Sequence, residues 1–129
     1  MTRRLLFAAL GTALACSLPA VAQVFTQRID VTLSSDEPFV GQFLPARGAR
    51  RVSAVVSSEV RATAYLDVTL DPLNADAVVE GASSVELQPR QPQLLAIPAA
   101  FIDIQAVRLR VINRDRTFGT VRATISVGR

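Results

Sequence analysis

Arginine is the side chain of this sequence best suited to chemistry with another molecule. Five arginines lie near the C-terminus, in two segments expected to be strands and in the loop between them: Arg108, Arg110, Arg114, Arg116 and Arg122. If segments 106–112 and 118–127 pair as a hairpin, the register that puts their apolar residues on one face puts the strand arginines on the other. Such a cluster predicts a site for a carboxylate, a phosphate or an acidic glycan. The alternative is that these side chains cover apolar sheet and are balanced by nearby carboxylates.

Catalytic groups are scarce. The chain has no His, all of its basic residues are Arg, and its one Cys is Cys16. After residue 22 there is therefore no side chain for a serine triad, a Ser–Lys dyad, a cysteine nucleophile or Schiff-base chemistry. Paired carboxylates of the glycosidase kind remain as candidates, and they are Glu59, Asp67, Glu80, Glu86 and Asp103. We expect most of these in turns or at outward strand positions, so the sequence predicts a protein without catalytic residues, with a carboxylate-based hydrolase as the distant alternative.

Metal ligands are equally scarce. Zinc, copper and iron sites favour His and Cys, so the sequence predicts no metal site of that kind and no cofactor. Calcium needs only oxygen ligands, and four residues with suitable oxygens share one loop-rich stretch: Asp71, Asn74, Asp76 and Glu80. Their spacing does not match an EF-hand. We expect a turn in which Asx side chains cap backbone amides instead.

The first 22 residues have the organisation of a secretory signal peptide. A short head with Arg3 and Arg4 precedes an apolar run of about 12 residues, and Ala20-Val21-Ala22 ends the segment with small residues at the cleavage positions. Cleavage after Ala22 would lower the formal charge from +3 to +1. The sequence thus predicts a signal peptide over 1–22 and an exported protein, located in the periplasm, at the cell surface or outside the cell.

Two alternatives to this interpretation of the leader stay open. Cys16 follows Ala13-Leu14-Ala15, which partly resembles a bacterial lipoprotein box, so a lipid anchor at Cys16 is the first alternative. The arginine pair at positions 3 and 4 is a weak indication of twin-arginine export. The apolar run is shorter than the roughly 20 residues that span a bilayer, so we expect no membrane span.

Alternation with a period of two dominates residues 23–129, which we predict to be a single domain. The clearest run is 61–70, where apolar residues alternate with polar ones and Asp67 is expected to face solvent. The expected strands are 24–33, 39–44, 51–57, 60–70, 77–80, 84–88, 93–98 or 101–104, 106–112 and 118–127. This spacing predicts an all-β fold, an antiparallel β-sandwich of immunoglobulin-like or jelly-roll type with about seven to nine strands. Phe118 is expected to plug the core.

These features favour a non-catalytic exported structural or interaction module that acts through its sheet faces or edges, with envelope or surface-polymer assembly as one such role. Its partner would be another protein or a second copy, because the strand at 23–33 can pair in its own fold or be donated to a neighbour. The alternative is an exported module that binds a glycan or another anionic molecule with the arginine-rich hairpin. No dense basic run with interleaved aromatics is present, so we expect no nucleic-acid partner.

Overall fold

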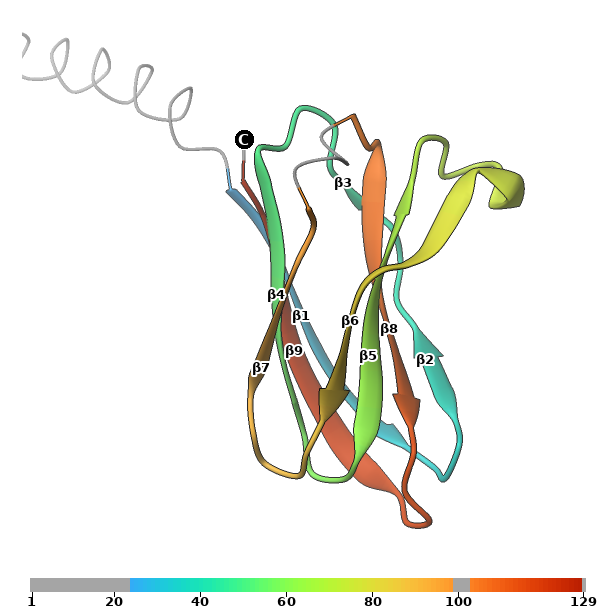
Figure 1. Cartoon of the computed structure of the whole chain (residues 1–129), viewed down its shortest axis with the longest axis vertical. Coiled ribbons are helices and arrows are strands. Elements are labelled where there is room, and N and C mark those ends of the chain that lie inside the picture. The colour runs from blue at the N-terminus through green and yellow to red at the C-terminus, as the bar shows by residue number, and fades with distance from the viewer. Residues whose placement is uncertain (1–23, 99–102, 129) are drawn as a thin grey trace, which may run out of the picture.

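The computed structural model describes residues 24–98 and 103–128, and strands make up nearly all the regular structure of these residues (Figure 1). The strands are β1 (Val24–Leu33), β2 (Pro38–Val40), β3 (Leu44–Pro45), β4 (Arg51–Ser58), β5 (Ala62–Thr69), β6 (Val78–Leu87), β7 (Gln93–Ala96), β8 (Ala106–Asn113) and β9 (Gly119–Gly128). One short 3-10 turn, η1 (Ala75–Ala77), leads into β6. Within the described residues no helix is long and apolar enough to cross a membrane. The predicted signal peptide at 1–22 and Cys16 lie outside the described residues.

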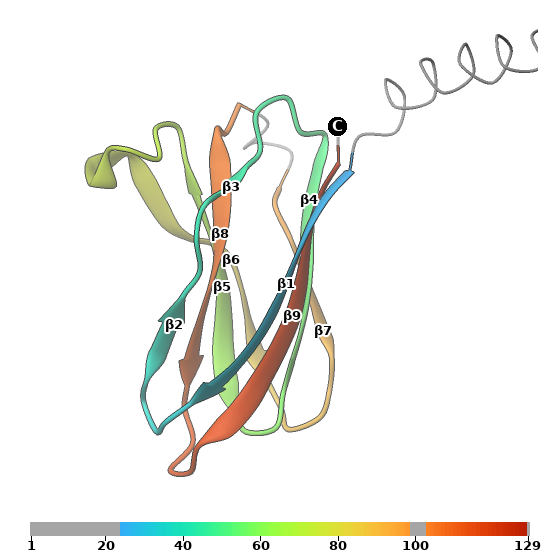
Figure 2. The same ribbon diagram turned by 180° about the vertical axis from the view of Figure 1, so that it is seen from behind.

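Two antiparallel sheets face each other across the core, as both views show (Figures 1 and 2). The first sheet has the order β1-β9-β4-β7. The second has the order β2-β8-β5-β6, with the short β3 also paired to β8. The predicted all-β antiparallel sandwich is therefore confirmed, and the nine strands of the described residues lie within the predicted range.

The alternating residues fill the space between the sheets. Along β9 every second side chain is buried, and β5 and β8 bury Leu66 and Leu109 completely. The largest fully buried side chains are aliphatic apart from Asn113, and each aliphatic one gains about 2 kcal/mol from leaving water. Packing of Leu, Ile and Val thus stabilises the described fold.

Several predicted strand boundaries were wrong. The strand expected at 39–44 is interrupted after Val40, where the amide of Gly41 donates to the carbonyl of Leu109. The strands expected at 77–80 and 84–88 are one strand, β6. It continues through a register shift at Gly81, whose φ of +68° is readily available only to glycine. The alternative strand at 101–104 falls largely outside the described residues.

Two side chains do not lie where the alternation predicts. Phe118 is exposed and does not plug the core. Its neighbour Gly119 packs so closely against Val60 that a Cβ added there would lie 2.7 Å from the Val60 methyl groups. Asp67, expected to face solvent, is fully buried on the outer side of its sheet by neighbouring long side chains.

The predicted pairing of the last two strands was also wrong. β8 pairs with β2, β3 and β5, whereas β9 pairs with β1 and β4, so the chain passes from one sheet to the other between them. Each strand has a buried side, and these two sides meet across the core. Alternation with a period of two is the same for strands that lie side by side and strands that face each other. The sequence pattern therefore could not separate the two arrangements.

Candidate functional site

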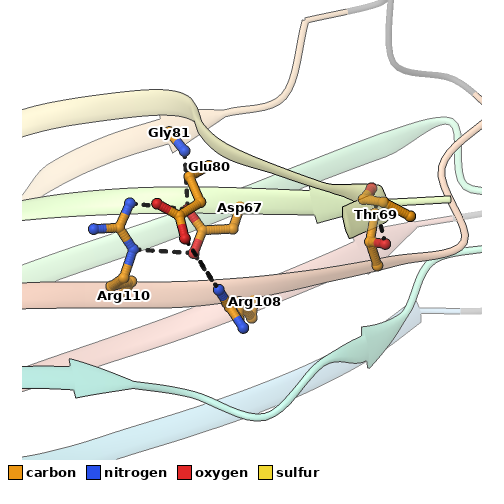
Figure 3. A network of polar contacts seen from close by, with 7 residues as sticks. Asp67, Thr69, Glu80, Gly81, Arg108 and Arg110 are labelled. Carbon is orange, nitrogen blue, oxygen red and sulfur yellow. Dashed lines mark hydrogen bonds and ion pairs between the residues drawn. The ribbon is translucent and has the colours of Figure 1, made fainter. Parts of the chain in front are cut away.

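Asp67 is the centre of a polar network on the outer face of the five-stranded sheet (Figure 3). Its Oδ2 accepts hydrogen bonds from Nε of Arg108 at 2.9 Å and Nε of Arg110 at 3.1 Å. Its Oδ1 accepts from Nη2 of Arg110 at 3.2 Å and from the amide of Gly81 at 2.9 Å. The strand register creates this arrangement, because Asp67 lies directly opposite Arg108 and Arg110 lies two residues along β8. The shifted register of β6 at Gly81 adds the third donor.

Aromatic rings cover the two arginines of this network. The guanidinium of Arg108 lies 4.7 Å from the ring centre of Phe43, and that of Arg110 lies 4.2 Å from the ring centre of Tyr65. Cations stacked on rings in this way gain a further attraction. The side chains of Arg108 and Arg110 are only 18% and 17% exposed, and the side chain of Asp67 is fully buried. Internal partners thus occupy two of the five arginines that were expected to bind a ligand.

The network holds Asp67 in its charged form. Burial raises the pKa of Asp67, but the hydrogen bonds from Arg110, Gly81 and Arg108 together lower it by more than burial raises it. The pKa of Asp67 therefore lies below its ordinary value. The hydrogen bond to Asp67 also raises the pKa of Arg110. A carboxyl group with a lowered pKa carries no proton to donate near neutral pH. The arrangement therefore joins β5, β6 and β8 and does not suit Asp67 to general acid catalysis.

The five predicted site arginines do not share one surface. Arg114 donates to the hydroxyl oxygens of Thr63 and Tyr65 at 3.2 Å each, so it extends the surface formed by Arg108 and Arg110. Arg116 is exposed in the loop between β8 and β9. Arg122 lies on the outer face of the other sheet, where its side chain is 75% exposed. The structure therefore brings three of the predicted residues onto one surface and separates Arg122 from them.

The loop considered for calcium is built as a turn. Oδ1 of Asp71 accepts the amide of Leu73, and Oδ1 of Asn74 accepts the amide of Asp76, each at 3.0 Å. The predicted Asx caps are therefore present. Across residues 24–98 and 103–128, no group of three or more His, Cys, Asp or Glu side chains is placed to hold a metal ion.

Strand edges are the other surfaces that can bind a partner, and three of the four described edges carry features that hinder strand addition. β7 has four residues and is flanked by Pro92 and Pro98. The β2–β3 edge consists of two short strands that begin at Pro38 and end at Pro45. The β6 edge is interrupted at Gly81. Prolines, short strands and bulges all prevent a second chain from pairing.

The edge formed by β1 has none of these features. β1 has ten residues without Pro or Gly, and it pairs with β9 in a continuous register from Val24 to Leu33. The prediction that this segment pairs in its own fold is thus confirmed. No other described strand pairs with the far side of β1, as its end position in the sheet order shows (Figure 2). β1 therefore presents a long, regular edge.

The backbone groups that line this edge can be identified. The carbonyl of Thr120 accepts a hydrogen bond from the amide of Glu59, the residue that follows β4. The backbone N–H and C=O groups of even-numbered residues of β9 are therefore directed toward β4. The backbone N–H and C=O groups of odd-numbered residues of β9 are then directed toward β1, where Ala123 is opposite Ile29. It follows that even-numbered residues of β1 direct their N–H and C=O groups outward. These residues are Val24, Thr26, Arg28, Asp30 and Thr32.

Comparison with known proteins supports the fold. No protein family and no curated protein sequence matches the chain. Among solved structures, the PBSX exported protein XepA superposes with a TM-score of 0.65 and 11% identity, over 81% of this chain and 37% of XepA. PirA superposes with a TM-score of 0.52 and 18% identity, over 78% of this chain and 92% of PirA. The SPBc2 prophage-derived protein YomS gives 0.51 and 12%, over 81% of this chain and 96% of YomS. At these identities the likeness shows a shared fold.

Proposed function

We propose that the protein is a non-catalytic structural or interaction module that binds a protein partner through the exposed edge of β1. The observation that carries this proposal is the contrast among the edges, since β1 alone among the described edges is long, regular and without proline, glycine or bulge. Its outward amides and carbonyls can continue the ladder with a partner strand. Main-chain hydrogen bonds then provide affinity and the adjacent side chains provide specificity.

We further propose that this module acts after export, in the periplasm, at the cell surface or outside the cell, with envelope or surface-polymer assembly as one role. The leader sequence at 1–22 supports export. The fold shared with a protein described as exported, XepA, is in agreement. The absence of His and Lys from the sequence, together with the lowered pKa of Asp67, supports a role that does not involve catalysis.

Binding of a glycan or another anion remains a second candidate, now at a different place. Arg122 and Arg90 line one cleft at the end of the four-stranded sheet, together with Ser57, Ser58, Thr120 and the carboxylate of Glu59, with which an anion would compete for the two arginines. We propose this cleft, rather than the surface of Arg108 and Arg110, as the place for such a ligand, because internal partners occupy those two arginines. Replacement of Arg122 by Ser would then abolish anion binding, with little change in stability because its side chain is largely exposed.

The edge proposal is tested by removing one outward amide. Thr26→Pro deletes a donor that faces away from β9, so the described ladder stays intact. Thr26→Val, which keeps the amide, is the matched control. Gentle lysates of cells that make the tagged chain are separated by size and probed for the tag. We expect a complex larger than the monomer for the original chain and for Thr26→Val, and a monomer for Thr26→Pro.

Circular dichroism of the purified variants shows whether each has kept its fold. A monomeric original chain in these lysates would overturn the proposal. A complex that persists in a folded Thr26→Pro variant would also overturn it, because the outward amides of β1 would then not be used.

A further inference from the structure

The outward side chains of β1 are arranged symmetrically about Ile29. Arg28 precedes it and Asp30 follows it, while Thr26 and Thr32 lie two residues further on each side. Reversal of the strand direction about Ile29 therefore exchanges Arg for Asp and Thr for Thr. A second copy of the strand placed antiparallel to the first would be complementary to it in charge.

The backbone limits the registers that two such strands can adopt. Residues whose amides face outward must lie opposite each other for the ladder to form, so an even-numbered residue must face an even-numbered residue. In these registers the outer faces of the two sheets are continuous, because opposite residues point to the same side. Registers that place an even-numbered residue opposite an odd-numbered one lose their hydrogen bonds.

Charge selects among the registers that remain. A two-fold axis at Arg28 would put two arginines opposite each other, and an axis at Asp30 would put two aspartates opposite each other, both of which are unfavourable. An axis at Ile29 puts Arg28 of each copy opposite Asp30 of the other. The same register places Thr26 opposite Thr32, where hydroxyl groups can hydrogen-bond.

Among the described residues, Asp30 has one ion-pair partner. Nε of Arg122 lies 3.4 Å from Oδ2 of Asp30, and the Asp30 side chain is 67% exposed. Arg122 is opposite Asp30 on β9, and a second copy would place its Arg28 opposite Asp30 on the other side. Asp30 would then be flanked by two arginines, as Asp67 is within the five-stranded sheet.

We propose that the partner at the β1 edge is a second copy of this chain, bound antiparallel about a two-fold axis at Ile29. The two four-stranded sheets become one eight-stranded sheet, and two Arg28–Asp30 pairs cross the interface. The same surface is used by both copies, so the assembly closes as a dimer. This inference rests on the proposed function, because it names the occupant of the β1 edge.

Charge reversal tests the occupant and the register together. Arg28→Asp puts like charges opposite each other twice across the interface, and so does Asp30→Arg. We expect each purified variant to dissociate at a concentration about tenfold or more above that of the original chain in sedimentation experiments. An equimolar mixture of the two variants should dimerise again, because every crossing pair is then of opposite charge. Arg61→Asp, an exposed change away from β1, is the control and should leave the dimer unchanged.

A cysteine scan tests the register independently of charge. In a Cys16→Ser background, Ile29→Cys places a thiol on the two-fold axis, whereas Gln27→Cys and Val31→Cys place thiols away from it. Under mild oxidation we expect the Ile29→Cys variant to form a disulfide-linked dimer fastest. Urea unfolding of each variant shows that the fold is kept. Fastest cross-linking at position 27 or 31, or a mixture of charge variants that stays monomeric, would overturn the proposed register.

The outcomes for the occupant and for the proposed function can be separated. One outcome is a purified chain that is monomeric up to about 1 mM and a cellular complex that still depends on the Thr26 amide. In that case the β1 edge binds a different protein, and the proposal that its partner is a second copy is wrong. If the cellular complex is absent as well, both proposals fail.

Discussion

Asp67 and Asp30 begin from the same local arrangement and have different surroundings. Each lies directly opposite an arginine on the neighbouring strand, Asp67 opposite Arg108 and Asp30 opposite Arg122. Asp67 is in the interior of its sheet, is fully buried and has three donor groups. Asp30 is in an edge strand and is largely exposed, and its one ion pair within residues 24–98 and 103–128 is with Arg122, at 3.4 Å. Position within the sheet therefore decides whether an Asp–Arg pair is enclosed by the fold or exposed to a partner.

The largest expected effect is the difference in stability lost when each of the two aspartates is removed. Asp67→Ala leaves two largely buried guanidinium groups without their carboxylate, so we expect a loss of about 3 kcal/mol in the free energy of unfolding. Asp30→Ala breaks an exposed pair and should cost less than about 1 kcal/mol. Urea unfolding of both variants measures the difference, which is best done at a concentration where the chain is monomeric. Equal losses would show that the two aspartates are not in different surroundings.

A smaller effect is expected from the arginines. Arg110→Ser removes two hydrogen bonds to Asp67 and the stacking on Tyr65, so we expect a loss of about 2 kcal/mol. Arg122→Ser should change stability by less than about 0.5 kcal/mol, because its side chain is largely exposed. The sequence-based interpretation expected Arg110 and Arg122 on one ligand-binding face. If Arg110→Ser were as stable as Arg122→Ser, the network around Asp67 would have no structural role.

The smallest effect is expected from pH. The pKa of Asp67 is lowered in the fold, so its charge stabilises the protein above its ordinary pKa of 3.8, and this contribution is lost as the pH falls through the lower folded value. The difference in unfolding free energy between the original chain and Asp67→Asn should therefore be constant from about pH 5 to 8. It should become smaller as the pH falls below 3.8. An Asp30→Asn variant is the matched comparison. A difference that widened in acid would mean that the pKa of Asp67 is raised.

The sequence predicted the strands well and their arrangement poorly. Alternation identified β1, β5, β8 and β9, because a strand with one buried face must repeat every two residues. The same pattern could not show that β8 and β9 lie in different sheets, since both arrangements bury the same residues. Asp67 was expected to face solvent because the alternation places it on the side of the strand opposite the buried apolar residues. Only the register of β5 with β8 and the shift at Gly81 place two arginines and an amide around its carboxylate.

The interaction surface was foreseen only in part. The sequence indicated that the segment beginning near residue 23 could pair with its own fold or with a neighbour, and it does pair along its full length with β9. The sequence could not show that this strand lies at a sheet edge, because edge position depends on which strands pair with it. It also could not show which amides of β1 face outward. That depends on the pairing of β9 with β4, including the hydrogen bond from Glu59 to Thr120.

Residue-resolved amide hydrogen exchange along β1 at two protein concentrations tests most directly whether the β1 edge receives a second strand. In dilute solution we predict an alternating pattern, with slow exchange at Gln27, Ile29 and Val31, which face β9, and fast exchange at Arg28 and Asp30, which face outward. In concentrated solution the outward amides should become protected as the second copy binds, and the alternation should disappear. An alternating pattern that is the same at both concentrations would contradict the claim that the β1 edge receives a second strand.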